Sequence, residues 1–154
     1  MATPIAKLGL SADYDPVLLV AASSGLLVLW QSMNVSTHRK RAGVKYPTVY
    51  ASDELAEKSL DAKKFNCAQR AHGNTLENLP TFLFNLLFVG LTYPRAATAL
   101  GATWLVGRVL YTIGYTSGVP AKRNSNGGML HALAHVGLLG TSFYIAAKSV
   151  LARF

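Results

Sequence analysis

Residues 70–78 read Arg-Ala-His-Gly-Asn-Thr-Leu-Glu-Asn and lead directly into the apolar run 79–91. On an α-helix of about 3.6 residues per turn, five polar residues in and beside this stretch share one narrow stripe. They are Asn66, Arg70, Asn74, Glu77 and Thr81. Ionisable groups at the mouth of a membrane helix are costly and generally serve a function. The stretch therefore predicts a membrane helix that carries a polar ligand surface on one face.

The composition is typical of a membrane protein. Hydrophobic residues make up 51% of the chain and charged residues 14%, whereas a typical soluble domain has about 25% charged residues. The charges are clustered and leave four apolar stretches, each close to the roughly 20 residues that cross a bilayer as a helix. These stretches are 17–33, 64–91, 96–115 and 129–152, of which 64–91 has a short apolar part and is expected to begin outside the lipid. We expect an all-α membrane protein, a four-transmembrane-helix bundle that forms a single domain over residues 1–154.

Lysine and arginine are concentrated in the first and third connections between these stretches. The first connection carries Arg39, Lys40, Arg41, Lys45, Lys58, Lys63 and Lys64, and the third carries Lys122 and Arg123. The second connection has only Arg95, and the N-terminal tail has only Lys7. The positive-inside rule then places the first and third connections in the cytosol and both termini in the lumen. The net charge of +8 is thus mostly a topology signal, and we expect no nucleic-acid partner.

Two local signals lie in the first connection. Residues 34–36, Asn-Val-Ser, match an N-glycosylation acceptor, but on this topology they face the cytosol and are expected to stay unmodified. Residues 52–58 are expected to form a short amphipathic or flexible surface segment.

The third apolar stretch carries a second polar stripe. Trp104, Arg108, Tyr111 and Tyr115 are spaced at i, i+4, i+7 and i+11 and lead towards Lys122 and Arg123. Tyr115 alone fits an interfacial anchor as well as a ligand contact. An arginine near the middle of a membrane helix, however, needs an anion or a carbonyl cluster. Arg108 therefore indicates a ligand site, and the alternative is an ion pair between Arg108 and Glu77 that joins two helices.

The two stripes are expected to converge at the cytosolic side, with Arg39 and Lys40 arriving from the end of the first helix. Such a site suits a small zwitterionic ligand with more than one carboxylate, because arginine binds carboxylates bidentately and a glutamate can hold an ammonium group. Glutathione has this pattern, and so do other peptides and phosphorylated metabolites. His131 and His135, at i and i+4, could suggest a metal, but packing or interhelical hydrogen bonding is favoured and we expect no metal site.

Three motifs resemble the superfamily of membrane-associated proteins in eicosanoid and glutathione metabolism. They are residues 70–80 (Arg-Ala-His-Gly-Asn-Thr-Leu-Glu-Asn-Leu-Pro), residues 106–111 (Val-Gly-Arg-Val-Leu-Tyr) and residues 114–115 (Gly-Tyr). The resemblance implies a homotrimer of four-helix subunits in the endoplasmic reticulum membrane or the nuclear envelope. It also implies glutathione as co-substrate between neighbouring subunits, and a lipid-facing groove for a hydrophobic partner.

Matching motif to motif, the resemblance implies a set of residues that bind glutathione. Arg70, Asn74, Glu77, Tyr111 and Tyr115 match the family pattern, Arg39 is expected near the carboxylates, and Arg108 completes the set from its place on the second stripe. The family's catalytic arginine follows the third helix. Arg123 is the preferred match, and the adjacent Lys122 is the alternative.

The chemistry then has a physical basis. A free thiol with a pKa near 8.5 is mostly protonated at neutral pH, and the thiolate is the nucleophile. A cation held near the sulfur favours ionisation, and a fall of about two pKa units corresponds to about 2.7 kcal/mol. The sulfur could then add to a lipid epoxide or reduce a lipid hydroperoxide.

Three function classes follow. The first is a glutathione S-transferase and glutathione peroxidase that acts on membrane lipids or other hydrophobic electrophiles. The second is a non-catalytic lipid-binding and lipid-presenting protein, like the lipoxygenase-activating members of the superfamily. The third is a structural membrane subunit whose charges only pair helices.

Overall fold

The structure is a computed structural model that describes residues 9–154. Within this range the chain is all-helical, as predicted. Its elements are η2 (Ala12–Tyr14), α1 (Asp15–Ala42), α2 (Asp53–Lys58), α3 (Leu60–Thr92), α4 (Pro94–Tyr115), η3 (Pro120–Asn124) and α5 (Leu130–Leu151). The symbols η2 and η3 denote short 3-10 helices. Lys7, which entered the predicted orientation, lies outside the described residues.

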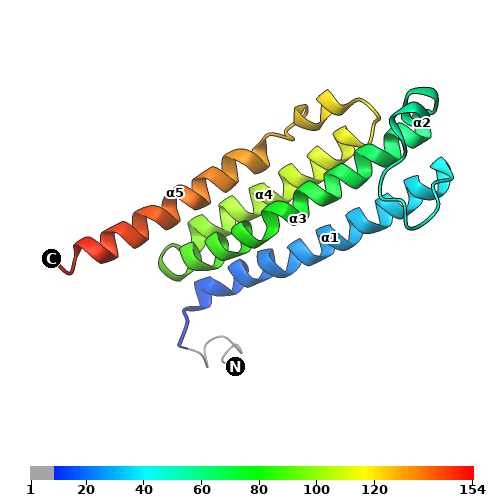
Figure 1. Cartoon of the computed structure of the whole chain (residues 1–154). Helices are drawn as coiled ribbons and strands as arrows, with labels where there is room; N and C mark the ends of the chain where they lie inside the picture. Colours follow the sequence, from blue (N-terminus) through cyan, green and yellow to red (C-terminus); the bar gives the residue numbers. More distant parts are fainter. Residues whose placement is uncertain (1–8) are drawn as a thin grey trace.

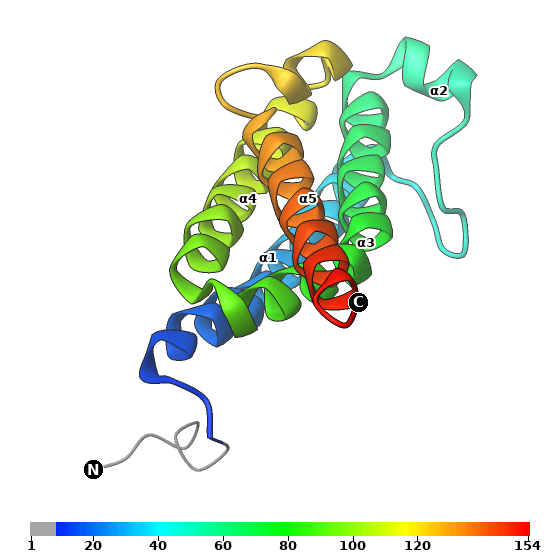
Figure 2. The same ribbon diagram turned by 90° about the vertical axis from the view of Figure 1, so that its left-hand side faces the viewer.

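The four long helices α1, α3, α4 and α5 run along one bundle, and the short α2 lies at one end of it (Figure 1). Helix α1 packs against α3 and α4, and α5 packs on the same two helices from the other side (Figure 2). Helix α1 begins and α5 ends at the same end of the bundle. The α1–α3 and α4–α5 connections therefore share the opposite end, as the predicted orientation requires.

Three helical segments are long and apolar enough to cross a membrane. They are Ala12–Ala42, Pro94–Tyr115 and Leu130–Leu151. Helix α3 is longer than any of them, with 33 residues, but its apolar part follows a polar half, and it does not reach the same hydropathy over a spanning length. Three of the four expected spans are thus supported, and a span through α3 stays a prediction.

Helix α1 extends beyond the expected range 17–33 and ends at Ala42. Residues 34–42 are mostly polar, but the inner stripe of the helix continues through them, because Val35 and Arg39 are both buried. The helix stops where Gly43 adopts a left-handed backbone with φ of 66°. Apolar content alone was therefore a poor guide to this boundary.

The segment 52–58, expected to be amphipathic or flexible, forms α2. The Ser52 hydroxyl accepts a hydrogen bond from the Leu55 amide, and the Ser59 hydroxyl accepts one from the Ala62 amide. These are N-caps of α2 and α3. Helix α3 accordingly begins at Leu60, before the expected residue 64.

The main core joins the four long helices at their apolar half. Phe82 of α3 and Trp104 of α4 stack with ring centroids 3.8 Å apart, and both are fully buried. On the other side of α4, a Cβ atom at Gly107 would collide with the backbone of His131. Helices α4 and α5 therefore pack backbone to backbone at this level. This close approach brings His131 beside the polar stripe of α4.

Candidate functional site

The polar stripes of α3 and α4 meet through direct hydrogen bonds. Arg108 Nη1 donates to Asn74 Oδ1 at 2.7 Å, and Asn74 Nδ2 donates to Glu77 Oε2 at 3.4 Å. Arg70 donates to both carboxylate oxygens of Glu77, at 2.6 and 3.2 Å. The structure thus brings these four predicted residues into one connected set.

Glu77 lies before the apolar run 79–91 and outside the three candidate spans. Hydrogen bonds from Arg70 lower the pKa of the Glu77 carboxyl. Both side chains remain about half exposed, at 45% for Arg70 and 55% for Glu77. The carboxylate is therefore ionised at neutral pH and open to a ligand.

Arg108 is almost completely buried, with 1% of its surface exposed. Its guanidinium lies 5.2 Å from the Trp104 ring centroid and 5.4 Å from that of Tyr111. Within residues 9–154 it forms no ion pair, and its Nε has no hydrogen-bond partner. The alternative of an Arg108–Glu77 ion pair is wrong for this structure, because Glu77 pairs with Arg70 on its own helix. Among the described residues, Arg108 is thus a buried cation with no carboxylate in direct contact.

The second stripe continues from Arg108 to the α4–α5 connection. The Tyr111 and Tyr115 rings meet edge to face with centroids 5.6 Å apart. The Arg123 guanidinium lies 5.5 Å from the Tyr115 ring centroid, and its Nη1 donates to the Pro120 carbonyl at 2.8 Å. The Lys122 side chain is exposed. Of the two candidate cations, Arg123 is the one in contact with the stripe.

A glycine permits this contact. A Cβ atom at Gly114 would collide with the Lys122 carbonyl oxygen and approach Arg123 Cα. The absence of a side chain lets η3 lie directly against α4. The backbone of the connection thereby holds Arg123 beside Tyr115.

A cleft of about 390 Å³ opens beside Arg108, between α3, α4 and α5. Its polar lining includes Asn74 and three residues that the sequence interpretation did not assign to the site, Asn78, His131 and His135. Asn78 ends the stretch 70–78, and the histidines had been assigned to packing or hydrogen bonding. Their i, i+4 spacing was the available signal, but only the tertiary structure places them facing Arg108.

The two histidines have defined hydrogen-bond partners. His135 Nε2 lies 3.2 Å from Thr81 Oγ1, which agrees with interhelical hydrogen bonding. His131 Nδ1 donates to the Gly128 carbonyl, because a carbonyl oxygen can only accept. Its Nε2 is then the acceptor nitrogen of the neutral ring. Residues 9–154 contain no group of three or more His, Cys, Asp or Glu side chains arranged to hold a metal ion.

Arg39 is held apart from this set. Its Nη1 donates to the Thr48 carbonyl at 2.6 Å, and its guanidinium lies between the rings of Tyr46 and Phe65, 4.3 and 4.6 Å from their centroids. Its Nε has no hydrogen-bond partner in the described structure, and a role in ligand binding stays a prediction. At the start of the α3 stripe, Asn66 is likewise engaged, because it bonds both backbone groups of Ala51.

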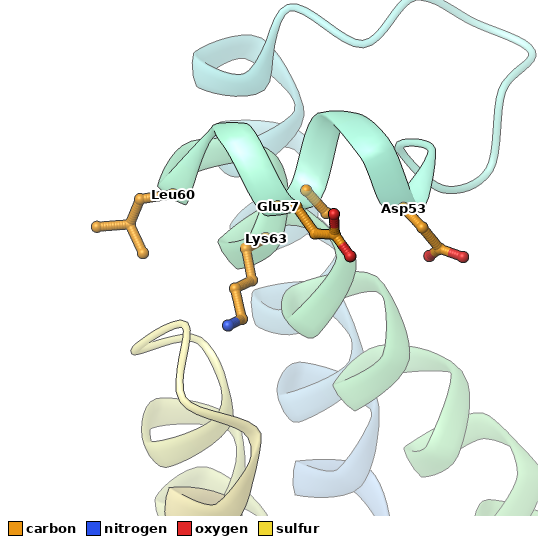
Figure 3. Close-up of a pocket in the computed structure, with 5 residues that line it drawn as sticks. Asp53, Glu57, Leu60 and Lys63 are labelled. Carbon is orange, nitrogen blue, oxygen red and sulfur yellow. The ribbon is translucent and has the colours of Figure 1, made fainter.

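Two further hollows differ in character. An apolar groove of about 430 Å³ lies between α1 and α4, lined by Ser23, Leu26, Leu27, Trp30, Leu105, Val106, Val109 and Leu110. A hollow of about 570 Å³ lies where α2 meets α3. Figure 3 shows that Leu60 and Asp53 there point to opposite sides, while Lys63 points along the bundle. This hollow contains none of the predicted site residues, and its side chains do not converge.

The comparisons with known proteins agree with the sequence motifs. Residues 17–144 match the MAPEG family, the superfamily that the motifs resemble. The chain is also similar to an uncharacterized protein of Synechocystis sp., with 36% identity over 98 residues. The aligned region covers 63% of this chain and 64% of that protein.

Proposed function

Since the chain belongs to the MAPEG family, we propose that it is a glutathione-dependent membrane enzyme that acts on lipids or other hydrophobic electrophiles. The family includes glutathione transferases, peroxidases and activating proteins. Within it, residues 34–36, 44–47, 65–67 and 118–123 most resemble microsomal glutathione S-transferase 3. We propose the activities of that class, which are glutathione conjugation of lipid epoxides, as in a leukotriene-C synthase, and reduction of lipid hydroperoxides.

The observation that carries the proposal is the buried guanidinium of Arg108. It is 1% exposed, has no carboxylate partner among the described residues and borders a cleft that also contains Asn74, Asn78 and the two histidines. A buried charge without a partner is strongly destabilising, and an anionic ligand removes that cost. Glutathione brings two carboxylates, and its ammonium group matches the ionised Glu77. The connected set of Arg70, Asn74, Glu77 and Arg108 therefore supports a zwitterionic ligand.

Arg123 is the residue that we propose to stabilise the thiolate. Bound glutathione would supply the thiol that adds to an epoxide or reduces a hydroperoxide. A guanidinium stays protonated at neutral pH, so Arg123 favours the ionised sulfur electrostatically but is a poor proton acceptor. Tyr115, beneath the guanidinium, orients it. His131, whose Nδ1 donates to the Gly128 carbonyl, lines the cleft beside Arg108.

The apolar groove between α1 and α4 is proposed to receive the hydrophobic substrate. Its residues Val109 and Leu110 lie between Arg108 and Tyr111 in the sequence of α4. The same helix thus presents a polar face to one ligand and an apolar face to the other. We further propose a homotrimer in the endoplasmic reticulum membrane or the nuclear envelope, with both termini in the lumen.

The test is a glutathione titration of the purified protein in detergent, in which thiolate absorbance and conjugate formation are both followed. The proposal requires saturable binding, a thiolate signal at neutral pH and turnover with a lipid epoxide or hydroperoxide. Binding without turnover of either substrate would instead favour the lipid-presenting role. No binding would favour the structural role.

A further inference from the structure

A buried hydrogen-bonded bridge joins α1, α3 and α4 next to the candidate site. Gln31 of α1 donates both hydrogens of its Nε2, one to Thr75 Oγ1 at 2.9 Å and one to Thr112 Oγ1 at 2.8 Å. The three side chains are 1%, 0% and 1% exposed. Gln31 lies on an inner stripe of α1 that is otherwise mainly apolar, between Leu27 and Val35. It is a polar residue placed where an apolar one would fill the same space.

Both hydrogens of the Gln31 amide are paired, whereas its Oε1 is buried without a hydrogen-bond partner in the described structure. The Thr75 hydroxyl donates to the Ala71 carbonyl, and the Thr112 hydroxyl donates to the Arg108 carbonyl. Each threonine oxygen can therefore only accept from a third group, and the Gln31 amide has two hydrogens to donate. In a low-dielectric interior such hydrogen bonds are stronger than in water, so the two bonds from Gln31 join α1 to α3 and to α4.

The bridge is adjacent to the contact that unites the two polar stripes. Thr75 follows Asn74 directly, and Thr112 lies one helical turn after Arg108. The Asn74–Arg108 hydrogen bond and the Thr75–Gln31–Thr112 bridge therefore span the same α3–α4 contact. Rotation of α3 relative to α4 would break both.

The geometry points to Gln31 as a positioning residue that holds α3 and α4 in the register where Asn74 reaches Arg108. Gln31 acts through the helices and does not itself touch the ligand. This inference rests on the proposed function where the readout is the affinity for glutathione. A second readout, the distance between α3 and α4, does not depend on glutathione.

The experiment compares Gln31→Leu with the wild type in detergent. The substitution removes both donors but strands no hydrogen, because the threonine hydroxyls keep their carbonyl partners. We expect the variant to fold, and its glutathione Kd to rise about tenfold, the effect of losing roughly 1.4 kcal/mol of binding free energy. Asn74→Ala and the double variant complete a cycle, in which the two effects should be non-additive because both disrupt the same contact.

The second readout is the distance between spin labels in the protein without glutathione. Leu76 and Ile113 are 44% and 56% exposed and flank the bridge on α3 and α4, so they can carry labels after Cys67→Ala. Gln31→Leu should broaden or shift this distance. If the wild type binds no glutathione, the proposed function fails, while the label distance still tests Gln31.

Three variants serve as controls. Thr75→Ser keeps the acceptor oxygen and should behave as the wild type. Thr75→Val keeps the shape of the side chain but loses the hydrogen bond from Gln31, so it should show part of the loss of affinity and part of the change in label distance. It also replaces Gln31→Leu as the test if that variant does not fold. Val20→Ala, on the same stripe of α1, should lower the unfolding temperature without changing affinity. The inference is overturned if folded Gln31→Leu, or folded Thr75→Val in its place, has wild-type affinity and label distance. Additive effects in the cycle with an unchanged label distance would also overturn it.

Discussion

Arg123 and Lys122 are neighbours in the chain but differ in what they contact. Arg123 lies over Tyr115, and Lys122 is exposed. Arg123→Ala should lower turnover at neutral pH about 25-fold, because a thiol whose pKa returns from about 6.5 to about 8.5 falls from roughly three-quarters to roughly 3% ionised at pH 7. Lys122→Ala, the matched control, should change turnover less than about threefold, because exposed charges contribute little. The measurement is turnover together with thiolate absorbance at saturating glutathione, and an equal loss in both variants would refute the assignment.

Arg108 should contribute to binding at the expense of stability. Arg108→Met fills a similar volume and removes a buried charge that has no carboxylate partner among the described residues. Replacing buried charged groups by well-packed apolar side chains often stabilises proteins by about 1–4 kcal/mol. We expect the variant to unfold at a higher temperature than the wild type in the absence of glutathione, and to lose the stabilisation that glutathione gives the wild type. Lower stability without ligand would show that the charge is compensated in some other way.

At the scale of single residues, helical periodicity predicted contacts within one helix but could not predict contacts between helices. Arg70, Asn74 and Glu77 were expected together because positions three and four apart share a helix face. The choice of Arg70 rather than Arg108 as the partner of Glu77 depends on the rotation of α4 against α3, which no single helix pattern contains. The same holds for Arg39, whose partners Tyr46 and Thr48 lie in a connection without a periodic pattern.

At the scale of elements, the contact between α4 and η3 depends on a missing side chain. Gly114→Ala places a Cβ atom on the Lys122 carbonyl, so η3 must shift and carry Arg123 with it. Overpacking of this kind costs about 1–3 kcal/mol, and we expect a drop in turnover of at least about tenfold with helix content unchanged by circular dichroism.

The matched control for this variant is Gly140→Ala in α5. Its new Cβ would meet nothing within 4 Å in the described structure, and alanine is the better helix former by up to about 1 kcal/mol. The control should therefore retain turnover and be slightly more stable. Equal activity in the two variants would show that η3 does not depend on close packing.

The sequence predicted the ends of helices correctly where hydropathy changes sharply, and it did not predict them where the change is gradual. The ends of α4 and α5 lie within about two residues of the expected ones, because Pro94 and the glycine-rich connection mark them clearly. Helix α1 continues through a polar segment that tertiary contacts bury, so its end could not be seen in hydropathy. The N-cap residues Ser52 of α2 and Ser59 of α3 are local signals for the starts of these helices that hydropathy does not contain.

At the scale of the whole molecule, the orientation in the membrane is open to a direct test. Residues 34–36 lie within α1, and helical backbone adds a second reason for Asn34 to stay unmodified. On expression in a eukaryotic cell, a glycosylation acceptor appended after Phe154 should be modified, and one inserted in the connection 43–52 should not. Gel mobility with and without endoglycosidase measures both. Modification of the inserted site alone would reverse the proposed orientation.

Helix α5 also has a consequence for biogenesis. Its buried residues in the described structure are Ala134, Leu138 and Ser142, and the first two belong to the core that all four long helices share, whereas the Gln31 bridge joins only α1, α3 and α4. The first three long helices to leave the ribosome can therefore form the Gln31 bridge while the last is still being synthesised. The final helix then completes the core, and its arrival closes the third wall of the cleft beside Arg108.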